Sequence, residues 1–345
     1  MIWDGREQEK GEGEREREME EKRRVCVTGA GGFVASWLVK LLLSKGYFVH
    51  GTVRDPSNEK NAHLKKLENS SENLQLFSAE LHDFNAIAAA IAGCKGVFHV
   101  ASPVIFTEVS NPEVEIIMPA LEGTKNVLNA CSETKVKRVV VVSSVDSVVI
   151  NPNWPKGTVM DENCWTDEEF CRKIQSWYCL SKVLAERGAL DYGKKHGLDV
   201  VTVCPSTVLG PLLQSTVNFS SFFFINILKG SLDSIRNHQS WHFVDVRDLA
   251  DALLLLYEKP DASGRYICTQ EPIRIADFLK LLKNMYPNYE IPTNSLPELD
   301  EDSEMTSEKL KKIRWKCREL KETISDTVQY YEEAGLLSMD MKIVE

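Results

Sequence analysis

One stretch near the start of the chain sets the architecture of the rest: Val25-Cys26-Val27-Thr28-Gly29-Ala30-Gly31-Gly32-Phe33-Val34-Ala35. Its first residues predict a short buried strand, its glycines a tight turn, and the apolar residues beyond them a helix. Gly29 lets the chain turn sharply, Gly32 lets the backbone approach a pyrophosphate, and the helix N-terminus offers free N–H groups to the anion. Ala35 stands where the usual motif has a third glycine, and it still permits close helix–strand packing. The stretch therefore predicts a phosphate-binding turn, with an ordinary strand–helix turn as the structural alternative.

Composition and charge narrow the class of protein. The chain has 345 residues, 43% of them hydrophobic, which is enough for a large α/β domain with a smaller lobe. A net charge of −10 argues against a nucleic-acid partner and against an anionic membrane surface. Because the sequence shows neither a secretory h-region nor a spanning segment, we expect a cytoplasmic protein.

The cysteines give no sign of a disulfide scaffold or a metal site. There are nine of them in a long chain, and none stands at zinc-ligand spacing, so we expect no metal. Cys164 and Cys171 lie seven residues apart in a polar loop. Reduced thiols and a redox-sensitive bridge are both open there.

Apolar runs alternate with helical patterns along most of the chain, which predicts a doubly wound parallel sheet with helices on both faces. After the first strand, strands are expected over 48–56, 74–81, 96–102, 138–142 and 199–209, with 243–246 and 264–268 returning to the sheet. Helices are expected over 85–92, 113–134, 177–196 and 248–257, and in a C-terminal lobe over 275–285, 307–313 and 319–335. Residues 151–176 are expected as a loop with short helices, and 292–302 as an acidic connection.

These patterns divide the chain into three parts. Residues 1–22 are charged and low in complexity and predict a disordered tail, in which Met19 is a candidate alternative start. A nucleotide-binding domain is expected over 23–205, with 241–268 returning to it, and a substrate-binding lobe over 206–240 and 269–337. An aromatic and aliphatic cluster begins the lobe: Phe219, Phe222, Phe223, Phe224, Ile225 and Ile227. It either packs as core or lines an apolar pocket for a ring-bearing substrate.

The residues at the predicted strand ends indicate which dinucleotide binds. Arg54 comes first at the end of the second strand, where the adenosine ribose is expected, and a guanidinium suits a 2′-phosphate, which favours NADP over NAD. Lys60 is a second phosphate partner, whereas Asp55 is expected to cap a turn. Glu80-Leu81 is expected near adenine, and the small residues Val100-Ala101-Ser102 are expected to border the cofactor.

A tyrosine and a lysine provide the candidate chemistry. Tyr178 and Lys182 are four residues apart on a predicted helix and point from one face. The ammonium is expected to lower the pKa of the phenol, which then donates a proton to a carbonyl oxygen as hydride reaches the carbon. Ser144, with Ser143 as the neighbour easily confused with it, is expected to bind the same oxygen. His99 has no carboxylate nearby in sequence, so we interpret it as a strand histidine rather than a base. Together these features predict a nicotinamide-dependent oxidoreductase.

The chain resembles the extended short-chain dehydrogenase/reductases and, within them, the plant cinnamoyl-CoA reductase and dihydroflavonol 4-reductase group. The similarity covers about residues 23–337, and its matched stretches are Val27–Trp37, Thr52–Pro56, Gly96–Pro103, Asp161–Trp165, Leu209–Thr216 and Val246–Asp248. The resemblance implies an α/β fold of Rossmann type: a doubly wound parallel sheet with a smaller, mostly helical C-terminal substrate lobe.

The resemblance also implies NADPH as the cofactor and a catalytic set of Ser144, Tyr178 and Lys182. Residue patterns and resemblance together give these expected cofactor-binding residues: Gly29, Gly31, Gly32, Phe33, Val34, Arg54, Lys60, Glu80, Leu81, Val100, Ala101, Ser102, Tyr178, Lys182, Pro205 and Val208.

The expected function is NADPH-dependent reduction of a carbonyl in a phenylpropanoid-type substrate, with the proton coming from Tyr178. Ser176, Leu180 and Ser181 depart from the residues usual around this tyrosine in cinnamoyl-CoA reductases, and Glu80 replaces the usual aspartate. These departures leave a cinnamoyl-CoA ester and an aromatic aldehyde or ketone both open as the substrate. The alternatives are a dihydroflavonol or flavanone 4-reductase and, from another class, a non-catalytic NADP-binding sensor. The expected partner is a small aromatic molecule, with no nucleic acid or membrane, and the chain is expected as a monomer or homodimer.

Overall fold

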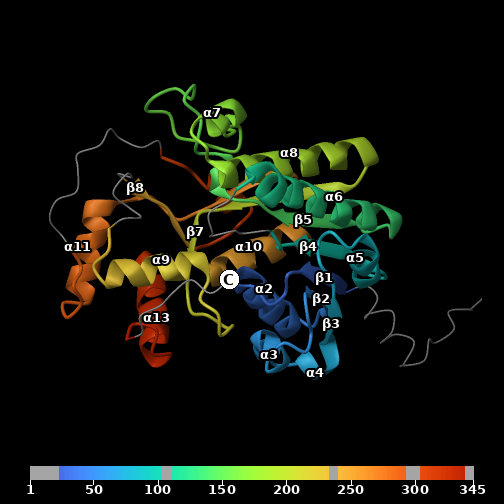
Figure 1. The fold of residues 1–345 in the computed structure, drawn as a ribbon, viewed down its shortest axis with the longest axis horizontal. Helices are drawn as coiled ribbons and strands as arrows, with labels where there is room; N and C mark the ends of the chain where they lie inside the picture. Colours follow the sequence, from blue (N-terminus) through green and yellow to red (C-terminus); the bar gives the residue numbers. More distant parts are fainter. Residues whose placement is uncertain (1–22, 103–109, 233–239, 293–303, 339–345) are drawn as a thin grey trace, which may run out of the picture.

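Strand β1 (Arg24–Thr28) is an inner strand of a sheet of seven parallel strands in the computed structural model, which describes residues 23–102, 110–232, 240–292 and 304–338 (Figure 1). The strand order is β10-β6-β5-β4-β1-β2-β3. The other six strands are β2 (Phe48–Val53), β3 (Leu74–Ser78), β4 (Gly96–His99), β5 (Arg138–Val142), β6 (Asp199–Pro205) and β10 (Gly264–Cys268). The order reverses between β1 and β4, which is where such sheets bind ligands. The predicted tail 1–22 and residues 293–302 of the predicted acidic connection lie outside the described residues.

Side chains of β1 point alternately to the two faces of the sheet, and helices cover both faces. Val25 and Val27 pack into one core and Cys26 into the other, and none of the three is exposed. The helices on the first face are α2 (Phe33–Ser44) and α10 (Val246–Glu258), and those on the second are α5 (Phe84–Ile91), α6 (Met118–Glu133) and α8 (Trp177–His196). The doubly wound fold predicted from the alternation of elements is confirmed.

Helix α2 carries the chain away from the glycine turn. Its N-cap is Gly32, which is extended and provides no side-chain hydrogen bond to the helix. Leu38 is fully buried against the sheet, whereas Trp37 donates a hydrogen bond from Nε1 to the carbonyl of Pro211 (2.8 Å). Gly46 follows the C-cap of the helix in the left-handed region, with φ +73°.

Three strands are shorter than predicted at the carboxyl edge, and the first of them, β2, ends at Val53 rather than at residue 56. β3 ends at Ser78 rather than at residue 81, since β2 ends beside it at Val53. β4 ends at His99 rather than at residue 102, since the next two backbone N–H groups donate to the Thr28 hydroxyl (both 3.1 Å) instead of to a strand. The residues expected around the cofactor therefore lie on loops at this edge.

The strand predicted over 199–209 is two strands. Pro205, which has no N–H, ends β6, and the next N–H, from Ser206, donates to the carbonyl of Cys268 (3.1 Å). The chain then leaves the central sheet as β7 (Thr207–Leu209), which pairs with β9 (Phe243–Asp245) in a separate two-stranded sheet. The prediction that 243–246 returns to the central sheet is wrong, whereas 264–268 does return, as β10 beside β6.

The helix predicted over 113–134 has two parts. A π-helical turn over Glu113–Ile117 precedes α6. Pro119, in the first turn of α6, has no N–H to donate to the preceding turn, which loosens the helix there. The remaining short elements are η1 (Glu59–Asn61), α3 (Ala62–Lys65), α4 (Ser70–Asn73), η3 (Val145–Ser147), α7 (Glu168–Lys173), β8 (Ser240–Trp241), β11 (Ile273–Arg274) and α12 (Glu308–Lys312).

A second core lies beyond the carboxyl edge of the sheet, among the helices at the left of Figure 1. These helices are α9 (Phe219–Leu228), α11 (Ile275–Met285) and α13 (Leu320–Glu333). Phe224 and Phe278 are buried at its centre, with ring centroids 6.2 Å apart. Of the three C-terminal helices predicted from their spacing, α11 and α13 pack in this core, whereas α12 packs against the central sheet through Leu310.

All nine cysteines are free thiols, and eight of them are buried. Cys164 and Cys171 pack into separate hydrophobic clusters, so the bridge that the sequence allowed is not formed. Within the described ranges, no helix combines the length and the apolar character that crossing a bilayer requires.

Candidate active site

A cavity of about 2160 Å³ opens at the carboxyl edge of the central sheet and extends to α9. Its volume exceeds the ~300–1,000 Å³ usual for a single small ligand. Every residue predicted to bind the cofactor or to take part in catalysis lies in its wall: Gly29, Gly31, Gly32, Phe33, Val34, Arg54, Lys60, Glu80, Leu81, Val100, Ala101, Ser102, Ser144, Tyr178, Lys182, Pro205 and Val208. Residues far apart in the sequence are therefore brought to one site.

The glycine turn presents backbone to this cavity. Gly29 has φ +67°, and a Cβ there would lie 2.9 Å from the Cβ of Ala101, so only glycine fits. Its N–H donates to Thr52 Oγ1 (3.0 Å), which fixes the turn against β2. Gly32 caps α2 without a side chain. The turn and the helix N-terminus can therefore bind an anion through backbone N–H groups and the helix dipole.

Two cationic side chains lie beside the turn. Arg54 and Lys60 both line the cavity. The carboxylate of Asp55 accepts hydrogen bonds from the hydroxyl (2.6 Å) and the N–H (2.8 Å) of Ser57, and these bonds lower its pKa. Asp55 thus caps its own turn, as predicted.

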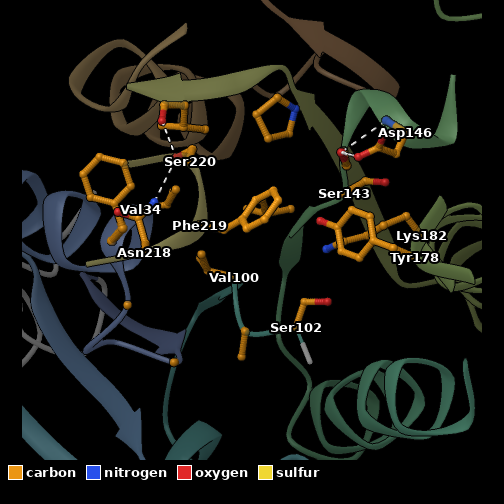
Figure 2. Close-up of a pocket in the computed structure, with 18 of the residues that line it drawn as sticks. Val34, Val100, Ser102, Ser143, Asp146, Tyr178, Lys182, Asn218, Phe219 and Ser220 are labelled. Carbon is orange, nitrogen blue, oxygen red and sulfur yellow. Dashed lines mark hydrogen bonds between the residues drawn. The ribbon is translucent and has the colours of Figure 1, made fainter. Parts of the chain in front are cut away.

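The candidate catalytic residues meet on one side of the cavity. Figure 2 shows Tyr178 and Lys182 projecting side by side from α8, with Lys182 Nζ 5.5 Å from the centroid of the Tyr178 ring. Ser144 follows β5 and lines the same wall. The hydroxyl of Ser143 donates instead to the buried carboxylate of Glu186 (2.8 Å). Both serines line the cavity, and their partners separate them: the Ser143 hydroxyl is bonded to Glu186, and the Ser144 hydroxyl is not.

The electrostatics of the tyrosine differ from the prediction. Burial raises the pKa of the Tyr178 phenol above its ordinary value, and the Asp146 carboxylate adds to this rise. Burial also lowers the pKa of Lys182 to about 8, against the opposing effect of Asp146. The prediction that the pKa of this phenol is lowered is wrong for the protein's own residues, because burial and the Asp146 carboxylate raise it. The phenol is protonated at neutral pH.

His99 is a structural residue, as predicted. It is buried between two threonines, with Nδ1 3.0 Å from Thr28 Oγ1 and Nε2 3.2 Å from Thr124 Oγ1. Burial lowers its pKa to about 4, and the charge of Lys182 adds to this. Elsewhere in the described chain, no group of three His, Cys, Asp or Glu side chains is placed to hold a metal ion.

The far side of the cavity is apolar and aromatic. Phe219 and Phe223 from α9 and Trp241 from β8 line it, and the Phe223 and Trp241 rings meet edge to face at 5.4 Å. Phe224 and Ile225 of the same cluster point the other way, into the second core. The aromatic cluster therefore contributes some side chains to the second core and others to an apolar wall of the cavity.

Several polar residues of the wall were not predicted from the sequence, among them Asp146 and Ser206. Asp146 comes two residues after Ser144 and accepts a hydrogen bond from its hydroxyl (2.8 Å). The Ser206 hydroxyl is buried in the cavity wall without a hydrogen-bond partner among the described residues. A Ser-x-Asp spacing at a strand end was a usable signal for Asp146. Nothing in the sequence marked Ser206, because its position depends on the unexpected break after β6.

A doubly wound parallel sheet whose glycine turn faces a tyrosine–lysine pair is the architecture of a Rossmann-type oxidoreductase. Residues 25–268 match the NAD dependent epimerase/dehydratase family, and the chain belongs to this family.

Particular relatives narrow the group. Cinnamoyl-CoA reductase 1 of Petunia hybrida is 44% identical over 317 residues, which is 91% of this chain and 93% of that protein. Vestitone reductase from alfalfa (Medicago sativa L.) has a similar structure, with a TM-score of 0.79 and 32% identity over 90% of this chain and 99% of that one. Yeast methylglyoxal/isovaleraldehyde reductase Gre2, solved in complex with NADPH, also has a TM-score of 0.79, at 26% identity and the same coverage. The resemblance to plant reductases of the extended short-chain group is confirmed.

Proposed function

We propose that this chain is an NADPH-dependent reductase of a carbonyl group in a phenylpropanoid-type substrate, either a cinnamoyl-CoA ester or an aromatic aldehyde. One observation carries the proposal: Ser144, Tyr178 and Lys182 lie in the wall of the same cavity as the glycine turn and the aromatic side chains of α9. The similarity to cinnamoyl-CoA reductases and vestitone reductase supports the same type of chemistry.

The residues present fit a dinucleotide with a 2′-phosphate. A Cβ at Gly29 would fill the cradle, and the N-terminus of α2 has no side-chain cap. We propose that the backbone around Gly29–Val34 binds the pyrophosphate and that Arg54 and Lys60 bind the 2′-phosphate. The proposed remaining contacts are Glu80, Leu81, Val100, Ala101, Ser102, Pro205 and Val208. When bound, NADPH supplies the hydride.

The protein's own side chains supply the proton of the reduction. The high pKa of Tyr178 keeps its phenol protonated near neutral pH, so it can donate a proton to a carbonyl oxygen. Lys182, with a pKa of about 8, lies beside the phenol as a cation for most molecules at neutral pH. The Ser144 hydroxyl is proposed to orient the carbonyl oxygen next to Tyr178.

The test measures NADPH consumption by the purified chain with feruloyl-CoA, coniferaldehyde, phenylacetaldehyde and a dihydroflavonol. Turnover of the first or second substrate supports the proposal. Turnover of the dihydroflavonol alone would move the assignment to a 4-reductase. NADPH binding without any turnover would favour a non-catalytic sensor.

Replacing Tyr178 with Phe tests the proton donor. We expect Tyr178→Phe to lower kcat by about 10²–10⁴-fold, because general acid catalysis is lost. The affinity for NADPH, measured by fluorescence titration, should stay close to that of the wild type, since the ring is retained. Near-wild-type turnover by this variant would exclude Tyr178 as the donor.

Three further proposals concern the whole chain. We propose a nucleotide-binding domain over 23–205, with 241–268 returning to it, and a substrate lobe built from 206–240 and 269–337, and the two separate cores support this division. We propose that the protein acts as a monomer or homodimer, without nucleic acid, which gel filtration with light scattering tests.

We also propose a cytoplasmic location. The free, buried thiols support it, and a fluorescent fusion tests it.

A further inference from the structure

Trp241 brings an aromatic ring to the cavity wall from an element other than α9. It belongs to β8 and lines the cavity together with Phe223 of α9. The two rings meet edge to face with their centroids 5.4 Å apart, and the Phe223 ring lies 5.4 Å from that of Phe219. Figure 2 shows Phe219 to the left of Tyr178 and Lys182, across the cavity. We call Phe223 and Trp241 the aryl corner.

The Trp241 ring is supported from behind. It packs against the rings of Phe243 (centroids 4.9 Å apart, tilted) and Phe278 (6.1 Å, edge to face), and both of these side chains are buried in the second core. Trp241 itself is only half-buried, because it also borders the cavity. Since close-packed rings fill the space behind it, the indole cannot withdraw when a ligand enters.

A hydrogen bond fixes the orientation of the indole. Trp241 Nε1 donates to Thr207 Oγ1 at 2.8 Å, and the Thr207 N–H donates to the His242 carbonyl at 3.2 Å. Thr207 precedes Val208 on β7, and both line the cavity. A buried indole N–H needs a partner, and here the partner lies on the strand that carries a proposed cofactor contact. The position of the ring is therefore fixed relative to the cofactor-binding wall.

Such a corner can distinguish an aromatic ring from a saturated ring of the same size. The faces of aromatic rings are negative and their edges positive, so two such rings attract each other in edge-to-face and offset arrangements beyond the effect of buried area. A saturated ring buries a similar apolar area but lacks this charge distribution. The preorganised rings of Phe223 and Trp241 thus favour an aryl group.

We propose that Trp241 is a specificity-determining residue: together with Phe223 it binds the aromatic ring of the carbonyl substrate. Thr207 acts through Trp241, by holding its indole, and is a positioning residue. The inference rests on the proposed function for the class of substrate, and it goes further by naming the side chains that select an aryl group.

Four substitutions separate the ring from its hydrogen bond. Trp241→Leu and Phe223→Leu each remove one ring of the aryl corner. Thr207→Val removes the acceptor of the indole proton at almost unchanged shape, whereas Thr207→Ser keeps a hydroxyl oxygen. Trp154→Leu is the matched control, because the Trp154 indole also donates a hydrogen bond (3.1 Å, to the carbonyl of residue 158) but lies outside the cavity wall.

The readout is the binding of two alcohols that differ only in the ring, 3-phenylpropan-1-ol and 3-cyclohexylpropan-1-ol. Calorimetric titration measures both Kd values in the presence of NADPH, which does not react with an alcohol. The ratio of the two Kd values cancels the contribution of the shared chain and hydroxyl. In Trp241→Leu the preference for the phenyl compound should fall by about 3–10-fold, the range for an aromatic pair. Phe223→Leu should change it in the same direction, and Trp154→Leu should keep the wild-type ratio.

The Thr207 variants test the positioning role. Thr207→Val should lower the same preference by about 2–3-fold, because the indole is no longer held, and Thr207→Ser should restore it. Thermal unfolding of every variant is recorded, since a merely structural role would change stability and leave the ratio of Kd values unmoved.

An unchanged ratio in both Leu variants of the aryl corner would overturn the proposal, and so would a wild-type protein that binds neither alcohol. If Trp241→Leu does not fold, Phe223→Leu decides the test. These titrations need no turnover, so their failure is distinct from a failure of the reductase assignment, which NADPH consumption with carbonyl substrates tests separately.

Discussion

Arg54 lies where β2 ends, next to an aspartate whose charge is already engaged. Asp55 is bound by Ser57, and Arg54 and Lys60 face the cavity beside the glycine turn. A planar guanidinium can bind a phosphate through two parallel hydrogen bonds, whereas a ribose hydroxyl offers no such partner. The choice between the two nicotinamide dinucleotides is therefore expected to depend on this residue.

Substituting Arg54 tests this expectation. Arg54→Ala should weaken NADPH binding by about 10–100-fold, the range for a lost charge-assisted hydrogen bond, and leave NADH binding nearly unchanged. Fluorescence titration with both dinucleotides measures the two effects. Arg54→Lys keeps the positive charge but cannot form two parallel hydrogen bonds, so its affinity for NADPH should lie between those of the wild type and Arg54→Ala. An equal loss for both dinucleotides would rule out the 2′-phosphate contact.

His99 gives the stability of the fold a predictable response to acid. Its pKa in the folded protein is about 4, below the ordinary value of 6.5, so between these values the unfolded chain binds a proton that the native state does not. Stability is therefore lost as pH falls through this window, by about 2 kcal/mol between pH 7 and pH 5.

Urea unfolding at the two pH values measures this response. His99→Gln keeps one donor and one acceptor for the threonines and should lose about 2 kcal/mol less between pH 7 and pH 5 than the wild type. His82→Gln is the control, because that side chain is 77% exposed, and it should keep the wild-type response. Identical responses in His99→Gln and the wild type would show that another group causes the acid loss.

At the scale of elements, α8 shows how a helix can approach a strand closely. Gly193 faces the segment leading into β6, and a Cβ there would lie 2.8 Å from the Leu198 carbonyl oxygen and 2.9 Å from Val200 Cγ2. Gly188, in the same helix, has no atom within 4 Å of an added Cβ. A side chain at position 193 would therefore clash with the neighbouring strand, whereas a side chain at position 188 would not.

An alanine at each position separates these reasons. Gly193→Ala should lower the free energy of unfolding by about 1–3 kcal/mol, because backbone and a β-branched side chain must move. Gly188→Ala should raise it by about 0.5–1 kcal/mol through helix propensity. Chemical denaturation compares both with the wild type, and a loss at Gly188 equal to that at Gly193 would contradict the packing argument.

Helices and strands whose bounds follow from a local sequence pattern could be predicted. Those whose bounds depend on pairing with a distant strand could not. The bounds of β5 and α8 follow from an apolar run and from helical spacing, and the structure has them where predicted. The break after Pro205 and the pairing of β7 with β9 depend on partners far along the chain, which no local pattern contains. The same division holds in the site: the spacing of Tyr178 and Lys182 is local, whereas the sign of the tyrosine's pKa shift comes from burial and from Asp146.

At the scale of the whole molecule, a charged cluster joins the two cores. Arg247 on α10 bonds the fully buried carboxylate of Asp245 (2.7 Å) and reaches Asp326 on α13 (2.7 Å). This contact could not be predicted from the sequence, because Arg247 and Asp326 are 79 residues apart. A buried carboxylate that loses its partner is costly, so the cluster connects the stability of one core to that of the other.

Substituting Arg247 tests whether the stability of the fold depends on this charged cluster. Arg247→Met is expected to lower the free energy of unfolding by about 3–5 kcal/mol, since the buried Asp245 carboxylate loses its counter-charge and keeps only the backbone N–H of residue 247 as a partner. Adding Asp245→Asn should restore part of the loss, because the buried charge is gone. Urea unfolding of the single and double variants measures both values, and a double variant less stable than Arg247→Met would contradict the account.

Cys317 is exposed, whereas the other eight thiols are buried. It precedes Arg318, whose guanidinium bonds Asp248 of α10, so it lies where the C-terminal segment joins the helix that covers the sheet. A maleimide dye will therefore attach to the native protein at a single natural position. The fluorescence of that dye can report on movement of the second core relative to the central sheet, and no cysteine has to be introduced for labelling.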